Sequence, residues 1–389
     1  MKTKLPAGWG EVEFLDCLEF EASNNKLKIQ QKDFLEEGEY PIIDQGEKFI
    51  AGYTNDKSKI YSKKLPVVIF GDHTRIIKFV NFSFALGADG VKILVPNKHI
   101  NAKYLYYVLN KLKIPSAGYS RHYKFLKEIK IPLPVKDDKP DLETQQKIVS
   151  ILEKAEKAKE WRKKADELTN ELLKAVFFEM FGKYFEGKKY LKKIEFFCPN
   201  KKNSIKAGPF GSSLKKESYV KKGYKIYGQE QVIKDDLNFG DYYIDRIKYL
   251  ELENYKVQEG DILISLVGTY GKISIVPKNF EEGIINPRLM KITLDKAKMN
   301  PIFFKYLFLS PYVKSQLEQV SHGGTMDILN VGLIKNTDFP EIPISLQNKF
   351  ASIVKKVEEV KEQQKQSKEQ LDNLFNVLMQ KAFKGELVV

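Results

Sequence analysis

Two long stretches of the chain, residues 143–181 and 345–383, repeat the same pattern of apolar and small residues. Ile148 in the first stretch is equivalent to Phe350 in the second, and Val176 is equivalent to Leu378. Both pairs are separated by 202 residues, so the two copies keep the same register without a gap. A repeat of this kind indicates a duplicated structural unit. The patterned positions of the first stretch are Ile148, Ile151, Ala155, Ala158, Ala165, Leu172 and Val176. Those of the second stretch are Phe350, Ile353, Val357, Val360, Ser367, Leu371, Leu374 and Leu378.

The spacing of these positions predicts a coiled-coil helix in each stretch. Intervals of three and four residues alternate in the second copy, which gives the repeat of about 3.5 that keeps one seam facing a partner helix. Small residues in one copy match bulkier ones in the other, as Ala155 matches Val357. We therefore expect the two helices to pack on each other, antiparallel if the molecule has a pseudo-twofold axis. The alternative is an ordinary bundle helix with a solvated face of lysine and glutamate.

The length and charge of the chain restrict its class. A chain of 389 residues is too long for one compact core and indicates two or more domains. An apolar content of 42% is enough to bury real cores, so the chain is no disordered polymer. The net charge of +14 favours a polyanionic partner, with nucleic acid first and an anionic membrane surface second.

The cysteines and the absence of long apolar runs indicate the compartment. Cys17 and Cys198 are the only cysteines, and two isolated thiols are predicted to be small buried core residues in a reducing cytoplasm. No Cys and His residues have the spacing of a metal site, so no metal is expected. The first residues do not resemble a signal peptide, and no run of about 18 apolar residues occurs. We therefore expect a soluble, cytoplasmic protein.

Two globules are predicted to alternate with the two long helices. Residues 9–134 contain short β-branched runs such as 67–70 and 91–95, with a helical pattern at 101–112, which predicts an α+β domain with a curled sheet. A second domain of this kind is expected to run to residue 344. The predicted fold is thus α+β, with two tandem α/β domains joined by two long antiparallel coiled-coil helices. The predicted divisions are residues 1–140, 141–183, 184–344 and 345–389.

The boundary residues of the two helices are similar. The polar stretch 136–140 predicts a linker, and Asp141 is the expected N-cap of the first helix. Ser345 is the expected N-cap of the second helix. Gly182 and Gly385 are suited to end the two helices.

Catalytic motifs are absent from the sequence. The segment 268–272 has a Gly-Lys pair, but its glycines are too close together for a P-loop, so we expect a turn between strands. No glycine-rich dinucleotide motif follows a strand. Asn286-Pro287-Arg288 lacks the second proline and the aromatic residue of an Asn-Pro-Pro-aromatic methyltransferase motif. Asp72 and His73 are interpreted as a turn that hydrogen-bonds itself, rather than as an acid–base or metal pair.

Polar, glycine-rich loops with aromatic and basic residues occur in both globules. Asn, Gln, Arg, Ser, Thr and His side chains can read base edges, and loops on a rigid scaffold often carry binding residues. Any single loop is as well explained by a solvated turn, but the set favours nucleic acid on a chain of charge +14. The candidate DNA-binding residues of the first globule are Tyr53, Asn55, His73, Thr74, Arg75, Ser120, Arg121, His122, Tyr123 and Lys124. Those of the second globule are Ser212, Ser213, Gln229, Gln231, Thr269, Tyr270, Asn286, Arg288, His322 and Thr325.

With these motifs the chain resembles, over essentially its whole length, the DNA specificity subunit of type I restriction-modification systems. A proline-bearing stretch, a short segment that ends in Gln, and a long helix occur twice, at 131–134 with Gln145 and at 342–343 with Gln347. The segments 70–75 and 87–90 are similar to one common type of target-recognition domain. The segments 208–213 and 260–263 are similar to another type.

This resemblance implies a non-catalytic reader of double-stranded DNA. Each globule would be a target-recognition domain for one half of a split, asymmetric target, and the helices would hold the halves apart. A helix of about 38 residues spans roughly 57 Å. That length corresponds to at most about 17 base pairs of B-DNA. We therefore expect half-sites centred one helical turn or slightly more apart.

The resemblance also implies partners that carry the cofactors. These are two methyltransferase subunits that use S-adenosylmethionine to modify adenine, and restriction subunits that use ATP and Mg²⁺. This chain is then expected to bind no cofactor itself. Three alternatives remain from the sequence: a free-standing nuclease or methyltransferase with drifted motifs, a coiled-coil adaptor, and a specificity subunit of a methylation-only system.

Overall fold

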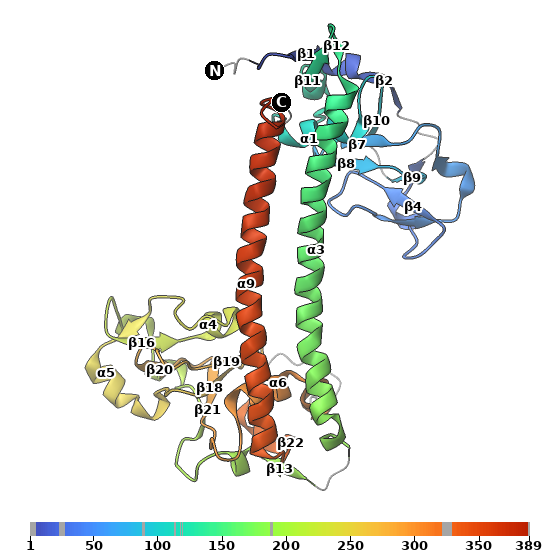
Figure 1. Ribbon diagram of the computed structural model, residues 1–389. Coiled ribbons are helices and arrows are strands. Elements are labelled where there is room, and N and C mark those ends of the chain that lie inside the picture. The colour runs from blue at the N-terminus through green and yellow to red at the C-terminus, as the bar shows by residue number, and fades with distance from the viewer. Residues whose placement is uncertain are drawn as a thin grey trace. The chain divides into compact units, whose positions relative to one another are not determined.

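Two long helices, α3 (Leu142–Phe181) and α9 (Ile344–Ala382), occupy the repeated stretches. They are visible in the computed structural model of the chain (Figure 1), which describes residues 5–22, 28–87, 90–112, 114–116, 118, 120–186, 190–320 and 329–387. The chain divides into two units: unit 1 is Met1–Lys164 with Gln364–Val389, and unit 2 is Ala165–Gln363. Each unit thus contains a mixed α/β domain and about half of each long helix.

The start of α3 follows its predicted cap. The carboxylate of Asp141 accepts hydrogen bonds from the amides of Glu143 at 3.0 Å and Thr144 at 3.2 Å, and from the Thr144 hydroxyl at 2.6 Å. These bonds satisfy amides that have no partner within the helix, so the N-cap prediction is confirmed.

The predicted start of α9 is wrong by a short distance. The helix already includes Ile344, and the carbonyl of Pro343 accepts the amides of Leu346 at 3.0 Å and Gln347 at 3.2 Å. Ser345 therefore lies inside the first turn, because the backbone carbonyl of the preceding proline starts the helical bonding.

The polar stretch 136–140 is a β-hairpin rather than an irregular linker. Strand β11 (Lys130–Lys136) turns into β12 (Lys139–Pro140), and Lys136 pairs with Lys139. Asp137 and Asp138 form the turn with φ angles of 53° and 59°. Aspartate tolerates this left-handed conformation, which two-residue hairpin turns require.

The domain of unit 1 contains three small sheets instead of the single curled sheet that we expected. The first is β2 (Leu18–Ala22), β10 (Val91–Pro96), β7 (Val67–Gly71) and β8 (Ile77–Val80), in that order and antiparallel. The second is β3 (Lys28–Ile29), β9 (Phe84–Gly87), β4 (Tyr40–Ile43) and β5 (Gly52–Thr54), with β6 (Ile60–Tyr61) also paired to β9. The third joins β1 (Trp9–Glu13) to the β11–β12 hairpin. Strand pairing between distant short segments decides this division, and a periodic pattern carries no information about it.

Helix α1 (Ala102–Lys111) connects the unit 1 domain to the long helices. Its buried residues Tyr104, Leu105 and Val108 share one core with Ile148 and Leu152 of α3. Met379 and Ala382 of α9 complete the same core. The N-terminal part of α3 therefore lies with the C-terminal part of α9, which makes the two helices antiparallel within this unit. The short helix α2 (Tyr123–Lys127) packs beside them.

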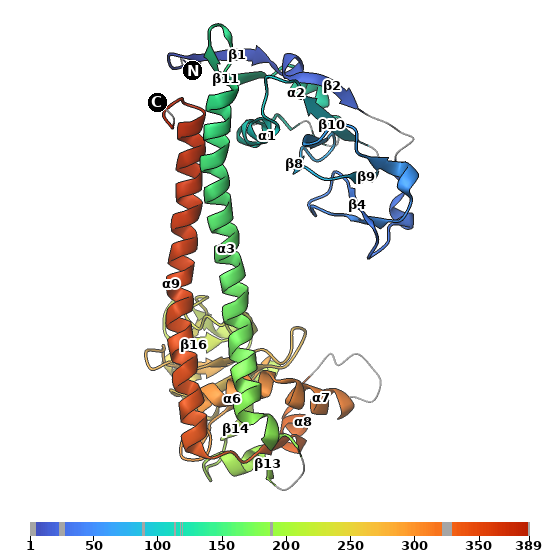
Figure 2. The same ribbon diagram turned by 45° about the vertical axis from the view of Figure 1, so that its right-hand side comes forward.

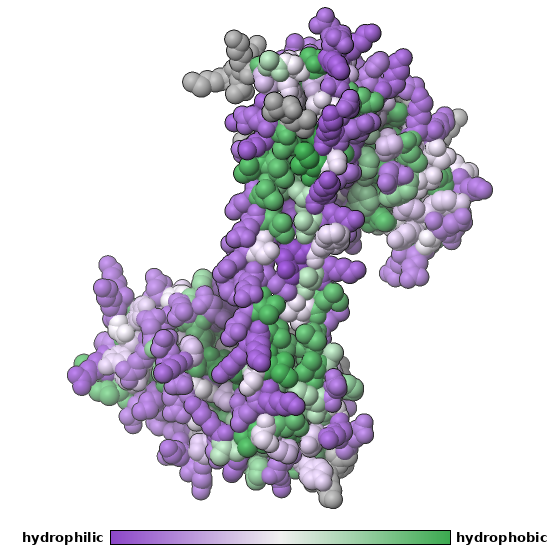
Figure 3. Space-filling model, viewed as in Figure 1, coloured by the Kyte–Doolittle hydropathy of each residue, from purple (hydrophilic) through white to green (hydrophobic). Residues whose placement is uncertain are grey.

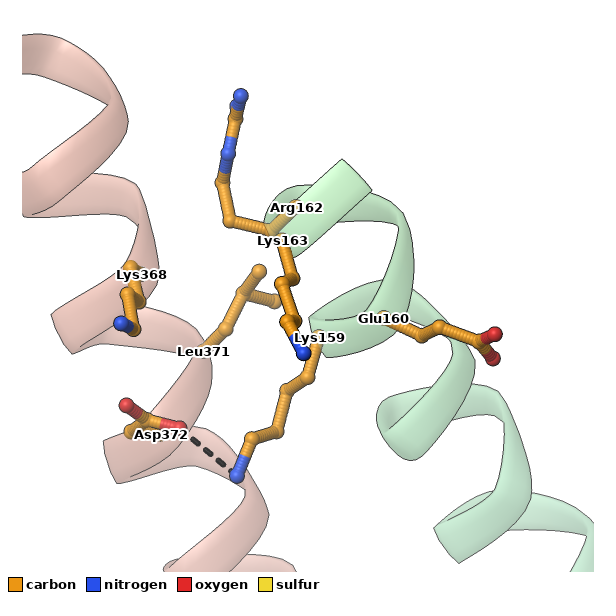
Figure 4. Close-up of a pocket in the computed structure, with 7 residues that line it drawn as sticks. All are labelled: Lys159, Glu160, Arg162, Lys163, Lys368, Leu371 and Asp372. Atoms are coloured by element: carbon orange, nitrogen blue, oxygen red, sulfur yellow. Dashed lines mark ion pairs between the residues drawn. The ribbon is translucent and has the colours of Figure 1, made fainter. Parts of the chain in front are cut away.

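An ion pair joins the two helices further along unit 1. The ammonium group of Lys159 on α3 lies 2.7 Å from the carboxylate of Asp372 on α9 (Figure 4). Lys163 and Lys368 line the same pocket as Leu371, so charged side chains lie beside an apolar one at this part of the seam.

The domain of unit 2 is built from two four-stranded sheets and a two-stranded one. The first sheet has the order β14 (Ile205–Ala207), β21 (Leu289–Ile292), β18 (Ile262–Ser265) and β19 (Ile273–Ile275). The second has the order β15 (Tyr219–Val220), β17 (Tyr243–Ile244), β16 (Tyr224–Tyr227) and β20 (Gly283–Ile285). The third pairs β13 (Leu191–Lys193) with β22 (Asp338–Pro340). Its helices are α4 (Gln229–Lys234), α5 (Arg246–Glu251), α6 (Pro301–Leu309), α7 (Pro311–Val320) and α8 (Val331–Asn336).

Aromatic side chains hold the long helices to the unit 2 domain. The rings of Phe177 and Phe181 on α3, Phe303 on α6 and Phe350 on α9 are in mutual contact, with centroids 4.7 Å to 6.4 Å apart. Helices α6, α7 and α8 gather beside this part of α3 (Figure 2). Here the C-terminal part of α3 lies with the N-terminal part of α9.

Short 3-10 helices complete the two units. They are η1 (Phe14–Cys17), η3 (Gln31–Asp33), η4 (Lys57–Lys59), η5 (Gly182–Tyr184), η6 (Ile194–Phe197), η7 (Gly211–Ser213), η8 (Lys216–Ser218) and η9 (Glu253–Tyr255). Cys17 and Cys198 lie at the ends of η1 and η6, and both are buried. Burial raises the pKa of both thiols to about 12, so each thiol acts as a neutral core group.

The predicted helix seam is only partly correct. Ile148, Ala155, Phe350 and Val357 are buried, and Ile151, Ala158, Ala165, Val176, Ile353, Leu371 and Leu378 are half-buried. Leu172, Val360 and Leu374 remain between 44% and 50% exposed, contrary to the prediction. The deeply buried positions include Val149, Leu152, Leu173 and Phe177, because each helix packs against its domain as well as against the other helix.

Candidate nucleic-acid interface

Four turns of unit 2 carry most of the candidate residues of the second globule. They are residues 208–213, 228–231, 266–271 and 286–288, and each follows the C-terminal end of a strand, β14, β16, β18 and β20 respectively. We refer to these segments as the four-turn cluster. Strands β16 and β20 are parallel, and β14 and β18 are both antiparallel to β21. Turns that follow strands of the same direction lie at the same edge of their sheet.

Direct contacts join the four turns to one another. The Gly208 amide donates a hydrogen bond to the carbonyl of Leu289 at 2.8 Å. The backbones also approach closely here, because a Cβ atom added to Gly208 would lie only 1.8 Å from the carbonyl oxygen of Asn286. The Asn286 amide donates to the carbonyl of Tyr227 at 2.8 Å, beside the turn 228–231. The side chain of Gln229 donates to the carbonyl of Val267.

The remaining link joins the turns 266–271 and 286–288, because the Leu266 amide donates to the carbonyl of Arg288 at 2.9 Å. Segments separated by up to about eighty residues in the sequence therefore form one continuous surface.

Most candidate side chains of the cluster are accessible. Ser212, Ser213, Thr269, Tyr270 and Arg288 are exposed, and Gln229 and Asn286 are half-buried. Gln231 is a correction, because its side chain is only 3% exposed and its Oε1 accepts the Gly228 amide at 3.0 Å. This bond caps α4, so Gln231 shapes the turn and does not present its amide to a ligand. His322 and Thr325 lie outside the described residues.

In unit 1 the turn 71–76 is bound to a segment that the sequence did not point to. Gln45 lies two residues after the end of β4, and its side-chain oxygen accepts a hydrogen bond from the His73 amide at 3.1 Å. The backbone carbonyl of Gln45 accepts a hydrogen bond from the Thr74 hydroxyl at 2.6 Å. Arg75 has a φ of 63°, and its guanidinium group donates to the carbonyl of Ile114 at 3.1 Å. Thr74 and Arg75 are exposed, so this turn presents two of its candidate side chains to solvent.

The segment 120–124 joins this turn through Asp72. The backbone carbonyl of Asp72 accepts the His122 amide at 2.8 Å, and its carboxylate accepts the Tyr123 amide at 2.7 Å. Arg121 and Lys124 are exposed, and Ser120 is half-buried. His122 and Tyr123 are corrections, since they are 1% and 5% exposed and hold the two segments together instead of facing a ligand.

Tyr53 and Asn55 are not brought to this group. Strand β4 leads into Gln45 at one end, whereas Thr54 of β5 pairs with Tyr40 at the other end. The Asn55 side chain accepts the Glu39 amide at 2.9 Å, which closes the local loop. The two residues therefore lie at the far end of the β4–β5 pair.

Two buried lysines support the candidate surfaces, and the sequence pattern did not reveal either of them. Lys78 is buried and donates to the carbonyls of Asp44 at 2.9 Å and Lys48 at 2.6 Å, which anchors the segment that carries Gln45. Burial lowers the pKa of Lys78, and Asp44 opposes this shift. Lys225 of β16 is also buried and lies 2.5 Å from the Glu281 carboxylate, whose pKa this hydrogen bond lowers. A strongly basic residue within a strand gives no local sign that it is buried.

The two units repeat one further contact that connects each domain to its long helix. In unit 1, Gln145 of α3 accepts the Asn101 amide at 2.9 Å and donates to the carbonyl of His99 at 3.1 Å. In unit 2, Gln347 of α9 accepts the Asn300 amide at 2.9 Å and donates to the carbonyl of Lys298 at 3.0 Å. Asn101 and Asn300 are the N-caps of α1 and α6.

Comparison with known families now identifies the class of protein. The family model described as the type I restriction modification DNA specificity domain matches residues 6–170 and again residues 186–373. The chain belongs to this family, with two tandem copies of the domain, one per globule.

Individual relatives agree with this assignment. The specificity subunit of the type I restriction enzyme EcoR124I/EcoR124II of Escherichia coli is 34% identical over 154 residues, which span 37% of this chain and 38% of that protein. The MjaVIII specificity subunit of Methanocaldococcus jannaschii is 23% identical over 99% of this chain and 94% of its own length. The chain therefore spans well under half of the first relative and nearly all of the second.

Solved structures show the same fold. An S subunit of a type I restriction-modification system from M. genitalium aligns with a TM-score of 0.55 at 15% identity, over 98% of both chains. A chain from a study of complex assembly and conformational transition of the type I R-M system aligns with a TM-score of 0.60 at 15% identity, over 99% of this chain and all of that one.

The described part of the chain contains neither a metal-binding group nor a membrane-spanning helix. No group of three or more His, Cys, Asp or Glu side chains is arranged to hold a metal ion among those residues. Among the same residues, every helix is too short or too polar to span a bilayer.

Proposed function

We propose that this chain is the subunit that reads DNA sequence in a restriction-modification complex, and that it recognises a split, asymmetric double-stranded target. Unit 2 would read one half-site through the four-turn cluster. Unit 1 would read the other through the turn 71–76 and the segment 120–124. The observation that carries the proposal is the joining of four distant turns into one surface with exposed Ser, Thr, Tyr and Arg side chains.

The chemistry of these side chains supports direct reading of bases. Arginine forms two hydrogen bonds with guanine in the major groove, and asparagine and glutamine do so with adenine. Arg288, Asn286 and Gln229 supply all three side-chain types within one cluster, and Arg288 is the most exposed of them. The other two also support the turns, since Gln229 donates to the carbonyl of Val267 and the Asn286 side chain accepts a hydrogen bond from the Arg288 amide at 2.9 Å. The candidate residues of unit 1 differ from those of the four-turn cluster in unit 2, so the proposed half-sites differ in sequence. The net charge of +14 supplies the attraction to phosphate that any such complex needs.

We also propose that the long helices set the spacing of the half-sites and receive the catalytic partners. Two methyltransferase subunits would bind S-adenosylmethionine and modify adenine, and restriction subunits would use ATP and Mg²⁺. Unit 2 exposes Leu168, Leu172 and Phe178 on α3, and Figure 3 displays apolar side chains gathered over this part of the helix. Apolar surface of this kind suits a protein partner. The chain would then contribute recognition and no catalytic group.

Methylome sequencing of the host, with and without the gene for this chain, tests the proposal. We expect one bipartite, non-palindromic motif, with a modified adenine in each half, to lose its methylation when the chain is absent. An unchanged methylome would refute the proposed role. In vitro, the purified chain with S-adenosylmethionine alone should leave DNA unmethylated, and robust methylation by the chain alone would assign it a catalytic role instead.

A further inference from the structure

Phe210 is an exposed apolar side chain on the four-turn cluster. It is 85% exposed, the highest value of any large apolar residue in the described ranges. It lies in the first turn of the four-turn cluster, two residues after Gly208 and two residues before the exposed Ser212. A single exposed apolar residue is common on protein surfaces, so its meaning depends on how it is held and on what surrounds it.

The backbone on both sides of Phe210 is anchored. Before it, Gly208 packs directly on the backbone of Asn286 and donates its amide to Leu289 at 2.8 Å. After it, the carbonyl of Phe210 accepts the Ser213 amide at 2.8 Å, and Leu214 is buried in the unit 2 domain. Pro209 is buried as well. The turn therefore holds the ring outward from a fixed base.

The surroundings of Phe210 combine cations with apolar groups. Lys215 and Lys216 follow the same turn and are exposed, as is the acidic Glu217 after them, and Arg288 is exposed on the turn against which Gly208 packs. Val267 and Tyr270, on the turn 266–271, are 40% and 38% exposed. The centre of a protein-docking patch is depleted of charged residues, whereas a DNA surface needs cations for the phosphates. The mixture around Phe210 therefore favours a nucleic acid as the occupant.

We propose that Phe210 is a wedge that inserts between two stacked base pairs of the half-site bound by unit 2. This inference rests on the function proposed above. Apolar side chains that enter a base step partly unstack it and kink the duplex. The exposed lysines that follow the turn would hold the phosphates of the bent strands. Because pyrimidine–purine steps unstack most easily, the wedge would add a preference for such a step without any hydrogen bond to it.

Fluorescence of 2-aminopurine tests the wedge. The full-length chain, in complex with its methyltransferase subunits, is bound to duplexes of the target in which 2-aminopurine replaces in turn each adenine except the methylated one of each half. The methylated adenine is left in place, because a methyltransferase takes that base out of the stack with or without a wedge. The fluorescence of 2-aminopurine increases when its stacking is lost, so the wild-type complex should give an increase at one position of a single half-site. Phe210→Ala should abolish this increase and weaken specific binding by roughly tenfold. Phe210→Leu, which keeps an apolar wedge, should retain most of both effects.

The matched control is Ile247→Ala, which removes an apolar side chain that is 73% exposed on α5, outside the four-turn cluster. It should change neither fluorescence nor affinity. A duplex with an abasic site at the wedge position is already unstacked, so it should restore the affinity of Phe210→Ala.

An unchanged fluorescence signal in Phe210→Ala would overturn the wedge while leaving sequence-specific binding, and with it the proposed function, intact. Loss of methyltransferase binding in this variant would overturn it too, because Phe210 would then be a protein contact. Absence of any specific DNA binding by the wild-type complex would refute the proposed function itself.

Discussion

At the scale of single residues, Gln145 and Gln347 show how a duplicated chain reuses one contact. Each side chain is fully buried, and each accepts a backbone amide and donates to a backbone carbonyl two residues earlier. A buried amide group without a partner is costly, so these glutamines fix each long helix to the capping loop of its domain.

Gln145→Leu should destabilise unit 1 by about 1–3 kcal/mol, because it leaves the Asn101 amide and the His99 carbonyl buried without their partner. Urea denaturation followed by tryptophan fluorescence measures this loss. Gln146→Leu is the matched control, since Gln146 is the exposed neighbour on the same helix. Equal midpoints for the two variants would contradict the assigned role of Gln145.

Arg288→Ala should relax recognition at one base position and weaken binding to the target by about 1–3 kcal/mol, if its guanidinium group reads a base. Binding selection from duplexes with randomised half-sites measures this change. Arg246→Ala is the control, because Arg246 is exposed on α5, away from the four-turn cluster. A uniform loss of affinity for every sequence would instead assign Arg288 to phosphate contact.

At the scale of elements, the start of α3 depends on a charged cap. Hydrogen bonds from the Thr144 hydroxyl, followed by those from the backbone, hold the pKa of the Asp141 carboxyl below its usual value. A carboxyl group with a lowered folded pKa stabilises the native state above its unfolded pKa, and this stabilisation is lost as the pH falls through the folded pKa. The stability of the cap should therefore depend on pH.

Asp141→Ala should lower the free energy of unfolding by about 1 kcal/mol at pH 7, which is typical of a lost N-cap. The difference from the wild type should shrink when urea denaturation is repeated near pH 3, because the wild-type carboxyl is then losing its charge. Glu167→Gln, on the same helix at an exposed position, serves as the control for a changed surface charge. A difference that is the same at both pH values would mean that the charge of Asp141 does not matter.

At the scale of the whole molecule, α3 and α9 each pass from one unit into the other without a break. A continuous helix changes its length by about 1.5 Å for every residue removed. The spacing of the two proposed half-sites is therefore open to a direct test by shortening both helices together.

Removal of one heptad from each helix, residues 162–168 and 363–369, should shorten the recognised spacer by about three base pairs. Methylome sequencing of cells that carry the shortened chain reports the spacer directly. A deletion in α3 alone should abolish methylation, because it shifts one helix by two turns against the other. An unchanged spacer after the double deletion would show that the helices do not set the distance.

The sequence alone determined the local features of this protein. The duplicated pattern predicted both long helices, Asp141 was correctly expected to cap the first of them, and the two cysteines were expected to be buried. Each of these features depends on residues close together in the chain, because helical periodicity and capping act over a few residues.

Only the tertiary structure decided which of the candidate residues a ligand can reach. His122, Tyr123 and Gln231 have side chains suited to reading DNA, yet they are buried and support the loops instead. Gln45 and Phe210 gain their importance from segments far away in the sequence, through Thr74 in one case and through Asn286, on which Gly208 packs, in the other. Burial and the joining of turns depend on contacts between distant segments, and the pattern of residues along one segment carries no record of its neighbours in space.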